Sequence, residues 1–97
     1  MNTSIILFKL TEQGAKNIKD APQRIEKAFK TIEAMGGKIL GFYATLGEYD
    51  YVAIGQMPSD EVLMTFLLGL GSLGNVKSTT LKAATKEEFV ALVKKLP

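Results

Sequence analysis

Two carboxylates and two tyrosines alternate in the middle of the chain, at Glu48, Tyr49, Asp50 and Tyr51. A carboxylate can act as a general base, and a neighbouring phenol or ammonium group can polarise a carbonyl substrate. In such an enzyme Asp50 would be the base, with Tyr49 or Lys9 as the polarising group. Carboxylates beside a hairpin turn more often accept hydrogen bonds from nearby backbone N–H groups. The pattern therefore favours a structural role for this pair.

Cysteine and histidine are both absent from the sequence. Without them the chain has no disulfide, no thiolate nucleophile, no zinc–sulfur site and no Ser-His-Asp triad. The commonest metal ligand and neutral-pH proton carrier is missing as well. Any catalysis would have to use carboxylates, lysine, tyrosine, hydroxyls or the backbone. We expect neither a metal nor a cofactor.

Two patterns that could indicate nucleotide or nucleic-acid binding lack the context they need. Residues 69–74 spell G-x-G-x-x-G, but a dinucleotide site has a strand before this motif and a helix after it, and here the order is reversed. Tyr49 and Tyr51 only loosely resemble aromatics that stack RNA bases, and a subunit interface or the sheet core explains them better. The net charge of +2 is small, with basic residues scattered along the chain. We expect no nucleic-acid partner.

The surrounding pattern predicts four strands and three helices in a single domain over residues 1–97. Apolar, β-rich runs predict strands over residues 4–10, 38–46, 49–57 and 75–84. Helical spacing and capping residues predict helices that begin at Asp20, Ser59 and Thr85. Residues 11–19 read as a polar connection with room for one helical turn, which Gly14 would interrupt. Gly47 with Glu48 reads as a tight hairpin.

This order, βαββαβ plus a terminal helix, predicts an α+β fold of ferredoxin-like topology. Right-handed crossovers give an antiparallel sheet of strand order 4-1-3-2 with two helices on one face. The first and third strands, placed centrally, are also the most apolar. The terminal helix is expected to turn its apolar residues inward, and these are Phe89, Leu92, Val93 and Leu96.

Both faces of this sheet are expected to be apolar. Alternation along the first strand puts Ile5 and Leu7 on one face and Ile6, Phe8 and Leu10 on the other. Along the third strand, residues 52 and 54 lie on one face of the sheet and residues 49, 51 and 53 on the other. Two helices cover only one face, and each large apolar side chain left in water forgoes roughly 1.5–3 kcal/mol. The terminal helix could cover part of the second face, but the sheet of a second copy could cover all of it. We expect a homodimer or higher homo-oligomer through the open face.

The second helix carries more apolar side chains than one inward stripe requires. Between residues 62 and 70 it has no charge, and Met64 and Leu68 fall outside the inward stripe. Two interpretations stay open. The helix is either tucked under the terminal helix or offers a second contact surface.

Four stretches of the chain resemble the GYD domain family. They are GEYDYV at residues 47–52, LTEQG at 10–14, DAPQR at 20–24 and SLGNV at 72–76. The likeness spans nearly the whole chain. The resemblance implies a ferredoxin-like fold that pairs into dimeric α/β barrels. It implies no reaction and therefore no catalytic residues.

The topology brings several polar residues to one edge of the predicted sheet. The end of the first strand, the hairpin between the second and third, the loop into the fourth and the start of the first helix meet there. These groups could simply satisfy one another and fasten the loops. A pocket is expected at this edge or between paired sheets. The ligand-binding candidates are Lys9, Thr11, Glu48, Tyr49, Asp50 and Asn75.

The favoured function is a non-catalytic homo-oligomeric module that binds a small molecule or another protein. The alternative is a cofactor-independent enzyme, resembling an isomerase or oxygenase, that acts on small aromatic or carbonyl substrates. The sequence begins with no signal-peptide pattern. Its longest apolar stretch, residues 62–74, is too short to cross a bilayer. We expect no membrane partner and a cytoplasmic location.

Overall fold

A computed structural model describes residues 2–97 as a four-stranded antiparallel sheet with helices. The elements in chain order are β1 (Asn2–Leu10), α1 (Glu12–Lys16), the 3-10 turn η1 (Ile18–Asp20), α2 (Ala21–Ala34), β2 (Lys38–Ala44), β3 (Tyr51–Met57), α3 (Asp60–Ser72), β4 (Val76–Ala83) and α4 (Lys86–Lys94). None of the helices in residues 2–97 has the length and apolar character that crossing a bilayer requires.

The sheet has the strand order β2-β3-β1-β4. Read from the opposite edge, this is the order 4-1-3-2. The two apolar strands β1 and β3 occupy the centre, with Ile6 opposite Ala53. On its other side β1 pairs with β4, where Ile6 lies opposite Thr80. A bulge near Leu40 shifts the register between β2 and β3.

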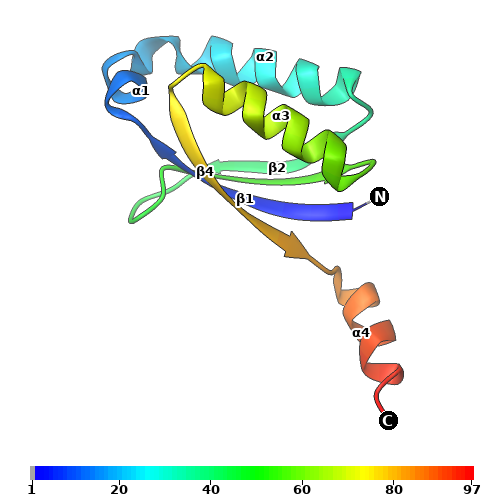
Figure 1. The fold of residues 1–97 in the computed structure, drawn as a ribbon. Helices are drawn as coiled ribbons and strands as arrows, with labels where there is room; N and C mark the ends of the chain where they lie inside the picture. Colours follow the sequence, from blue (N-terminus) through cyan, green and yellow to red (C-terminus); the bar gives the residue numbers. More distant parts are fainter. Residues whose placement is uncertain (1) are drawn as a thin grey trace.

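Helices α2 and α3 lie side by side on one face of the sheet (Figure 1). Pro22 occupies the first turn of α2, where its missing N–H costs nothing, and Gly36, with a φ of 87°, follows its end. The hydroxyl of Ser59 accepts a hydrogen bond from the Val62 N–H at the start of α3. Both helices therefore begin close to their expected positions.

The core lies between this helical layer and the sheet. Every second residue of β1 and β3 points into it, which puts Ile6 and Ala53 opposite one another inside the core. The buried apolar cluster consists of Ile6, Phe8, Ile32, Ala53, Met57, Leu63 and Phe66. The helices thus cover the face that carries Tyr51, and the face of Ile5 and Leu7 is the open one.

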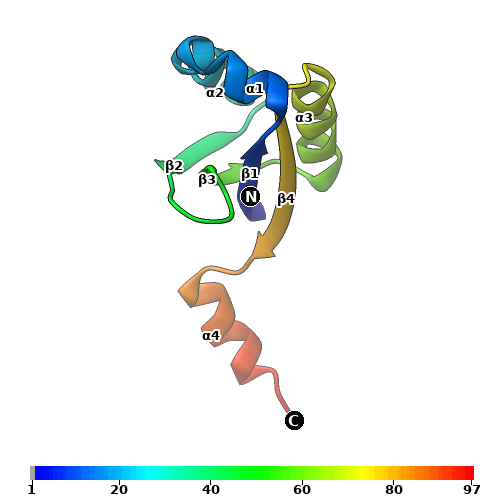
Figure 2. The ribbon, with the colours of Figure 1, turned by 90° about the vertical axis from the view of Figure 1, so that its left-hand side faces the viewer.

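The terminal helix differs from its expected position. It was expected to pack inward, but α4 extends away from the body beyond the end of β4 (Figures 1 and 2). All its residues are exposed, with Phe89 at 59% and Leu92 at 54%. The prediction failed because an amphipathic stripe shows that a helix needs a partner without showing which surface supplies it.

Several smaller boundaries also differ from the prediction. Residues 45–50 form a longer loop in place of a tight hairpin, with Gly47 at a φ of 110°. Asp20 precedes α2 but makes no side-chain cap, because η1 already holds it in a helical conformation. Residues 12–16 form the one-turn helix α1 within the expected polar connection, and Gly14 lies inside this turn without interrupting it. Helix α3 continues through Gly69 and Gly71, so the glycine motif forms no phosphate-binding loop.

Candidate functional site

The end of β1 meets the loop before β4 through Thr11 and its neighbours. The Thr11 hydroxyl donates to the Gly74 carbonyl at 2.5 Å and accepts from the Gly14 N–H at 3.1 Å. Its backbone N–H donates to the Asn75 carbonyl at 3.0 Å. The Gln13 side chain donates to the side-chain oxygen of Asn75 at 3.0 Å. Thr11 and Asn75 are therefore together, as expected, and both are engaged in joining α1 to this loop.

Asp50 ties the loop after β2 to the end of β1. Its carboxylate accepts a hydrogen bond from the Leu10 N–H at 2.8 Å, and its own N–H donates to the Phe8 carbonyl at 2.8 Å. The Asp50 carbonyl also accepts from the Thr45 N–H. Of these three bonds only the one to the carboxylate depends on an aspartate side chain, and it fastens the loop to the backbone as expected at this position.

Lys9, Glu48 and Tyr49 form a small cluster on the surface. The Lys9 ammonium lies 3.6 Å from the Glu48 carboxylate and 5.4 Å from the centre of the Tyr49 ring. The side chains of Lys9 and Glu48 are 49% and 71% exposed, so solvent screens this ion pair. The cluster lies beside Asp50 in sequence, and its three residues line neither the cleft described below nor the shallow depression on the outer side of α2.

The six candidate residues therefore divide into two groups joined by the end of β1. Thr11 and Asn75 form one group, while Lys9, Glu48, Tyr49 and Asp50 form the other. Most of their polar atoms bind one another or the backbone. Their arrangement suits fastening of loops better than it suits proton transfer to a substrate.

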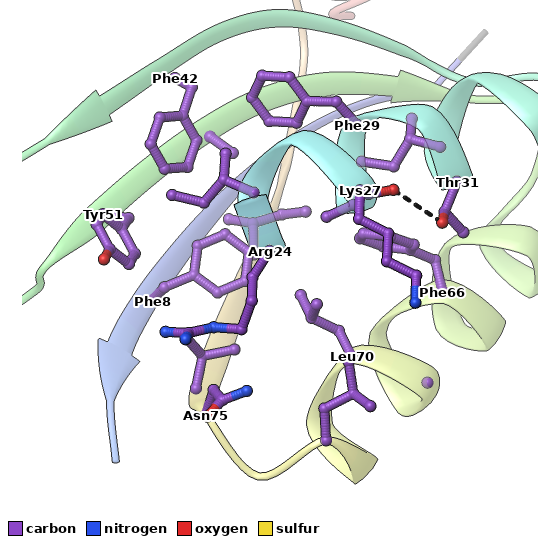
Figure 3. A pocket seen from close by; sticks show the side chains of 18 of the residues that line it. Phe8, Arg24, Lys27, Phe29, Thr31, Phe42, Tyr51, Phe66, Leu70 and Asn75 are labelled. Atoms are coloured by element: carbon purple, nitrogen blue, oxygen red, sulfur yellow. Dashed lines mark hydrogen bonds between the residues drawn. The ribbon is translucent and has the colours of Figure 1, made fainter. Parts of the chain in front are cut away.

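A cleft lies elsewhere, between α2, α3 and the covered face of the sheet. Its volume is about 460 Å³ and its surface is almost wholly apolar. Figure 3 shows the rings of Phe8, Phe42 and Tyr51 on its walls, with Phe66 on the side of α3. The Phe42 ring contacts those of Phe29 and Tyr51, with centroids 5.6 and 5.3 Å away.

Of the six candidate residues only Asn75 lines this cleft. The sequence therefore did not predict the cleft as a binding site. The available signal was the small residues Ala21, Ala28 and Gly69, which lie on the facing sides of α2 and α3. Small side chains at a helix contact can permit close approach or leave space, and sequence does not distinguish these outcomes.

Two cations, Arg24 and Lys27, line the cleft from α2. Figure 3 shows Lys27 extending from α2 toward α3, whereas Arg24 extends past Phe8 toward Asn75. The guanidinium of Arg24 donates one hydrogen bond, from Nη1 to the Asn17 carbonyl at 2.8 Å. Within residues 2–97 neither cation has a salt-bridge partner, and no acidic residue lines the cleft.

The opposite face of the sheet is apolar and uncovered. Alternation and register place the following side chains on it: Ile5, Leu7, Tyr43, Val52, Ile54 and Leu81. Tyr43 is 59% exposed. On the outer side of α3, Met64 and Leu68 are exposed as well, so the terminal helix does not cover them.

Comparison with known proteins gives one family, one curated relative and solved structures of similar fold. The family model described as "GYD domain" matches residues 5–93. A protein of Thermus thermophilus named "Glutamine synthetase and cystathionine beta-lyase binding protein" is 33% identical over 95 residues, which cover 97% of this chain and all of the relative.

Two crystal structures show a similar fold. The protein TTHA0845 from Thermus thermophilus superposes with a TM-score of 0.55 at 23% identity, covering 88% of this chain and 95% of its own. The protein MtbAldR gives a TM-score of 0.66 at 17% identity over 88% of this chain. This chain spans about half, 52%, of MtbAldR.

Proposed function

The chain belongs to the GYD domain family, and from this premise we propose that it is a non-catalytic binding module that acts as a homo-oligomer and binds protein partners. The observation that carries the proposal is the apolar surface that the chain leaves uncovered. It comprises the open sheet face and the stripe of α4. Uncovered apolar surface on this scale is typical of protein interaction sites.

The open sheet face supports self-association. Ile5, Leu7, Val52 and Ile54 lie on the two central strands, β1 and β3. Figure 2 shows α2 and α3 on the other side of this sheet, and no helix of residues 2–97 packed on the open face. Each such side chain is half-buried in the single chain and gains part of the roughly 1.5–3 kcal/mol that full burial of an exposed one provides. A second sheet packed face to face would bury all four from each copy.

The Thermus relative supports a protein partner. Its name gives glutamine synthetase and cystathionine beta-lyase as proteins that it binds, and its whole length aligns with this chain. We extend that role to this chain and propose that its partners are metabolic enzymes of this kind. The exposed stripe of α4 and the outer side of α3 offer surface for such contacts.

The alternative of a cofactor-independent enzyme has weaker support. It assigns the base to Asp50 and polarisation to Tyr49 or Lys9. The carboxylate of Asp50 already accepts the Leu10 N–H, and none of the three residues lines the apolar cleft. A substrate held in the cleft would therefore not contact the proposed base.

Sedimentation equilibrium of the full chain tests the self-association. The wild type is expected to give at least twice the monomer mass of 10.6 kDa at micromolar concentrations. Ile54→Lys places a charge on the open face and is expected to shift the mass toward the monomer. Ile18→Lys makes the same exchange in η1, off that face, and is expected to leave the mass unchanged. A monomeric wild type at every concentration would refute the oligomer.

A binding experiment tests the partner. Purified glutamine synthetase and cystathionine beta-lyase from the organism that encodes this chain are each titrated against immobilised wild-type protein. Saturable binding of at least one enzyme is the expected result. Absence of binding to both, with the protein folded by circular dichroism, would contradict the assignment of these partners and leave the mass measurement unaffected.

A further inference from the structure

We propose that the cleft between α2 and α3 is a binding site for a small apolar carboxylate. This site is separate from the protein-binding surfaces of the proposed function and does not depend on them. The cleft has about 460 Å³, within the range of roughly 300–1,000 Å³ typical of small-molecule pockets. A single chain of 97 residues with so large an apolar space forgoes packing contacts that an apolar ligand would restore.

The walls of the cleft favour a ligand whose main part is apolar. Phe8, Phe42, Tyr51 and Phe66 present ring faces and edges, and aliphatic side chains fill the surface between them. Such a surface binds hydrocarbon chains and aromatic rings through area burial and ring contacts. The lining of the cleft holds few polar groups that could form hydrogen bonds with a ligand.

The charges of the cleft select a negative head group. Arg24 and Lys27 are its only charged lining residues, and both belong to the same stretch of α2, three positions apart. The Asn17 carbonyl restrains one end of the Arg24 guanidinium, whose remaining N–H groups can still bind a carboxylate. An apolar ligand with a single carboxylate matches the apolar walls and can pair with one of these two cations.

Decanoate, with decanol as its uncharged counterpart, tests the assignment by calorimetry below the micelle concentration. Wild-type protein is expected to bind decanoate saturably. The double variant Arg24→Gln with Lys27→Gln is expected to bind decanoate roughly tenfold more weakly and decanol as the wild type does. Equal loss for both probes, or no loss for decanoate, would overturn the assignment of an anionic ligand.

Two glycines of α3 provide a matched test of location. Gly69 lines the cleft and Gly71 does not, and a Cβ atom added at either position meets nothing within 4 Å. Gly69→Leu is expected to occupy part of the cleft and to weaken decanoate binding, while Gly71→Leu keeps the wild-type affinity. Thermal melting establishes that both variants are folded. Undiminished binding by a folded Gly69→Leu variant would place the ligand elsewhere.

Intermolecular NOEs show whether decanoate lies in the cleft, whether it lies on the open sheet face, or whether α4 of another copy fills the cleft. Decanoate is expected to contact the Phe66 ring. Contacts to Ile54 in its place would assign the ligand to the open sheet face and overturn the proposal. Contacts between Phe89 of one copy and Phe66 of another, with no decanoate binding, would show that α4 fills the cleft and would overturn it as well.

Discussion

At the residue scale, Gly14 allows α1 to lie against the loop before β4. A Cβ atom at this position would come within 2.0 Å of the Asn75 carbonyl oxygen, which itself accepts the Thr11 N–H. The oxygen belongs to the backbone and cannot rotate away as a flexible side chain would. Glycine is required here by the close approach, although it lies inside a helix where alanine has the higher propensity.

We predict opposite effects of the same substitution at two helical glycines. Gly14→Ala is expected to lower the free energy of unfolding by about 1–3 kcal/mol, because the backbone must shift to admit the methyl group. Gly69→Ala, with open space around its Cβ, is expected to raise it by about 0.5–1 kcal/mol through helix propensity. Urea denaturation measures both changes. Equal stability of the two variants would mean that the α1 contact relaxes without cost.

The role of Asp50 could be predicted from the sequence. Its position beside a turn predicted hydrogen bonds to backbone N–H groups, and the bond from Leu10 N–H confirms that interpretation. The grouping of Thr11 with Asn75 followed from topology, since the end of one strand and the start of its neighbour share an edge. The cleft was not foreseen, because its existence depends on the separation of α2 and α3 rather than on any motif.

At the element scale, helix α4 depends on its own local interactions. It has nine residues and no buried side chain, and isolated helices of this length are marginal in water. A capping box supports its start. The Thr85 N–H donates to the Glu88 carboxylate at 2.8 Å, and the Glu88 N–H donates to the Thr85 hydroxyl at 3.1 Å. The Thr85–Glu88 pair was readable from sequence because all its partners lie within four residues.

This capping box makes α4 sensitive to acid. The backbone N–H of Thr85, followed by its side chain, lowers the pKa of Glu88 below the ordinary value of 4.5. The carboxylate therefore favours the folded helix at pH values above 4.5, and this contribution is lost as the pH falls through the lowered pKa. We expect the Cα chemical shifts of α4 to move toward coil values in that acidic range while those of β1 stay constant.

Two neighbouring substitutions check the origin of this effect. Glu88→Gln is expected to remove the pH dependence of the α4 shifts, because no titrating group remains in the capping box. Glu87→Gln changes the adjacent exposed residue, which makes no such bond, and is expected to preserve the dependence. An unchanged titration in the Glu88 variant would assign the acid sensitivity to another group.

At the scale of the whole molecule, the chain is a compact body with one helix projecting from it (Figure 1). Periodicity and turn signals were sufficient for the four strands, the two packed helices and the strand neighbours. The position of α4 was not predictable, because its apolar stripe can pack against any sufficiently large apolar surface. Which face α2 and α3 cover was also open, since Ile5 and Leu7 are as apolar as Ile6 and Phe8.

The projecting helix leads to a prediction about assembly. If a partner copy buries α4, association stabilises the folded chain, and the melting temperature rises with protein concentration. Phe89→Ser combined with Leu92→Ser removes two exposed apolar side chains that contribute nothing to the core of their own chain. We expect this double variant to melt like the wild type at low concentration and to show a weaker rise of the melting temperature at high concentration, because less apolar area is buried between copies.

Lys94→Ser, in the same helix, is the control and should keep the wild-type rise of the melting temperature with concentration. A double variant with the full rise would mean that copies associate through the open sheet face without help from α4.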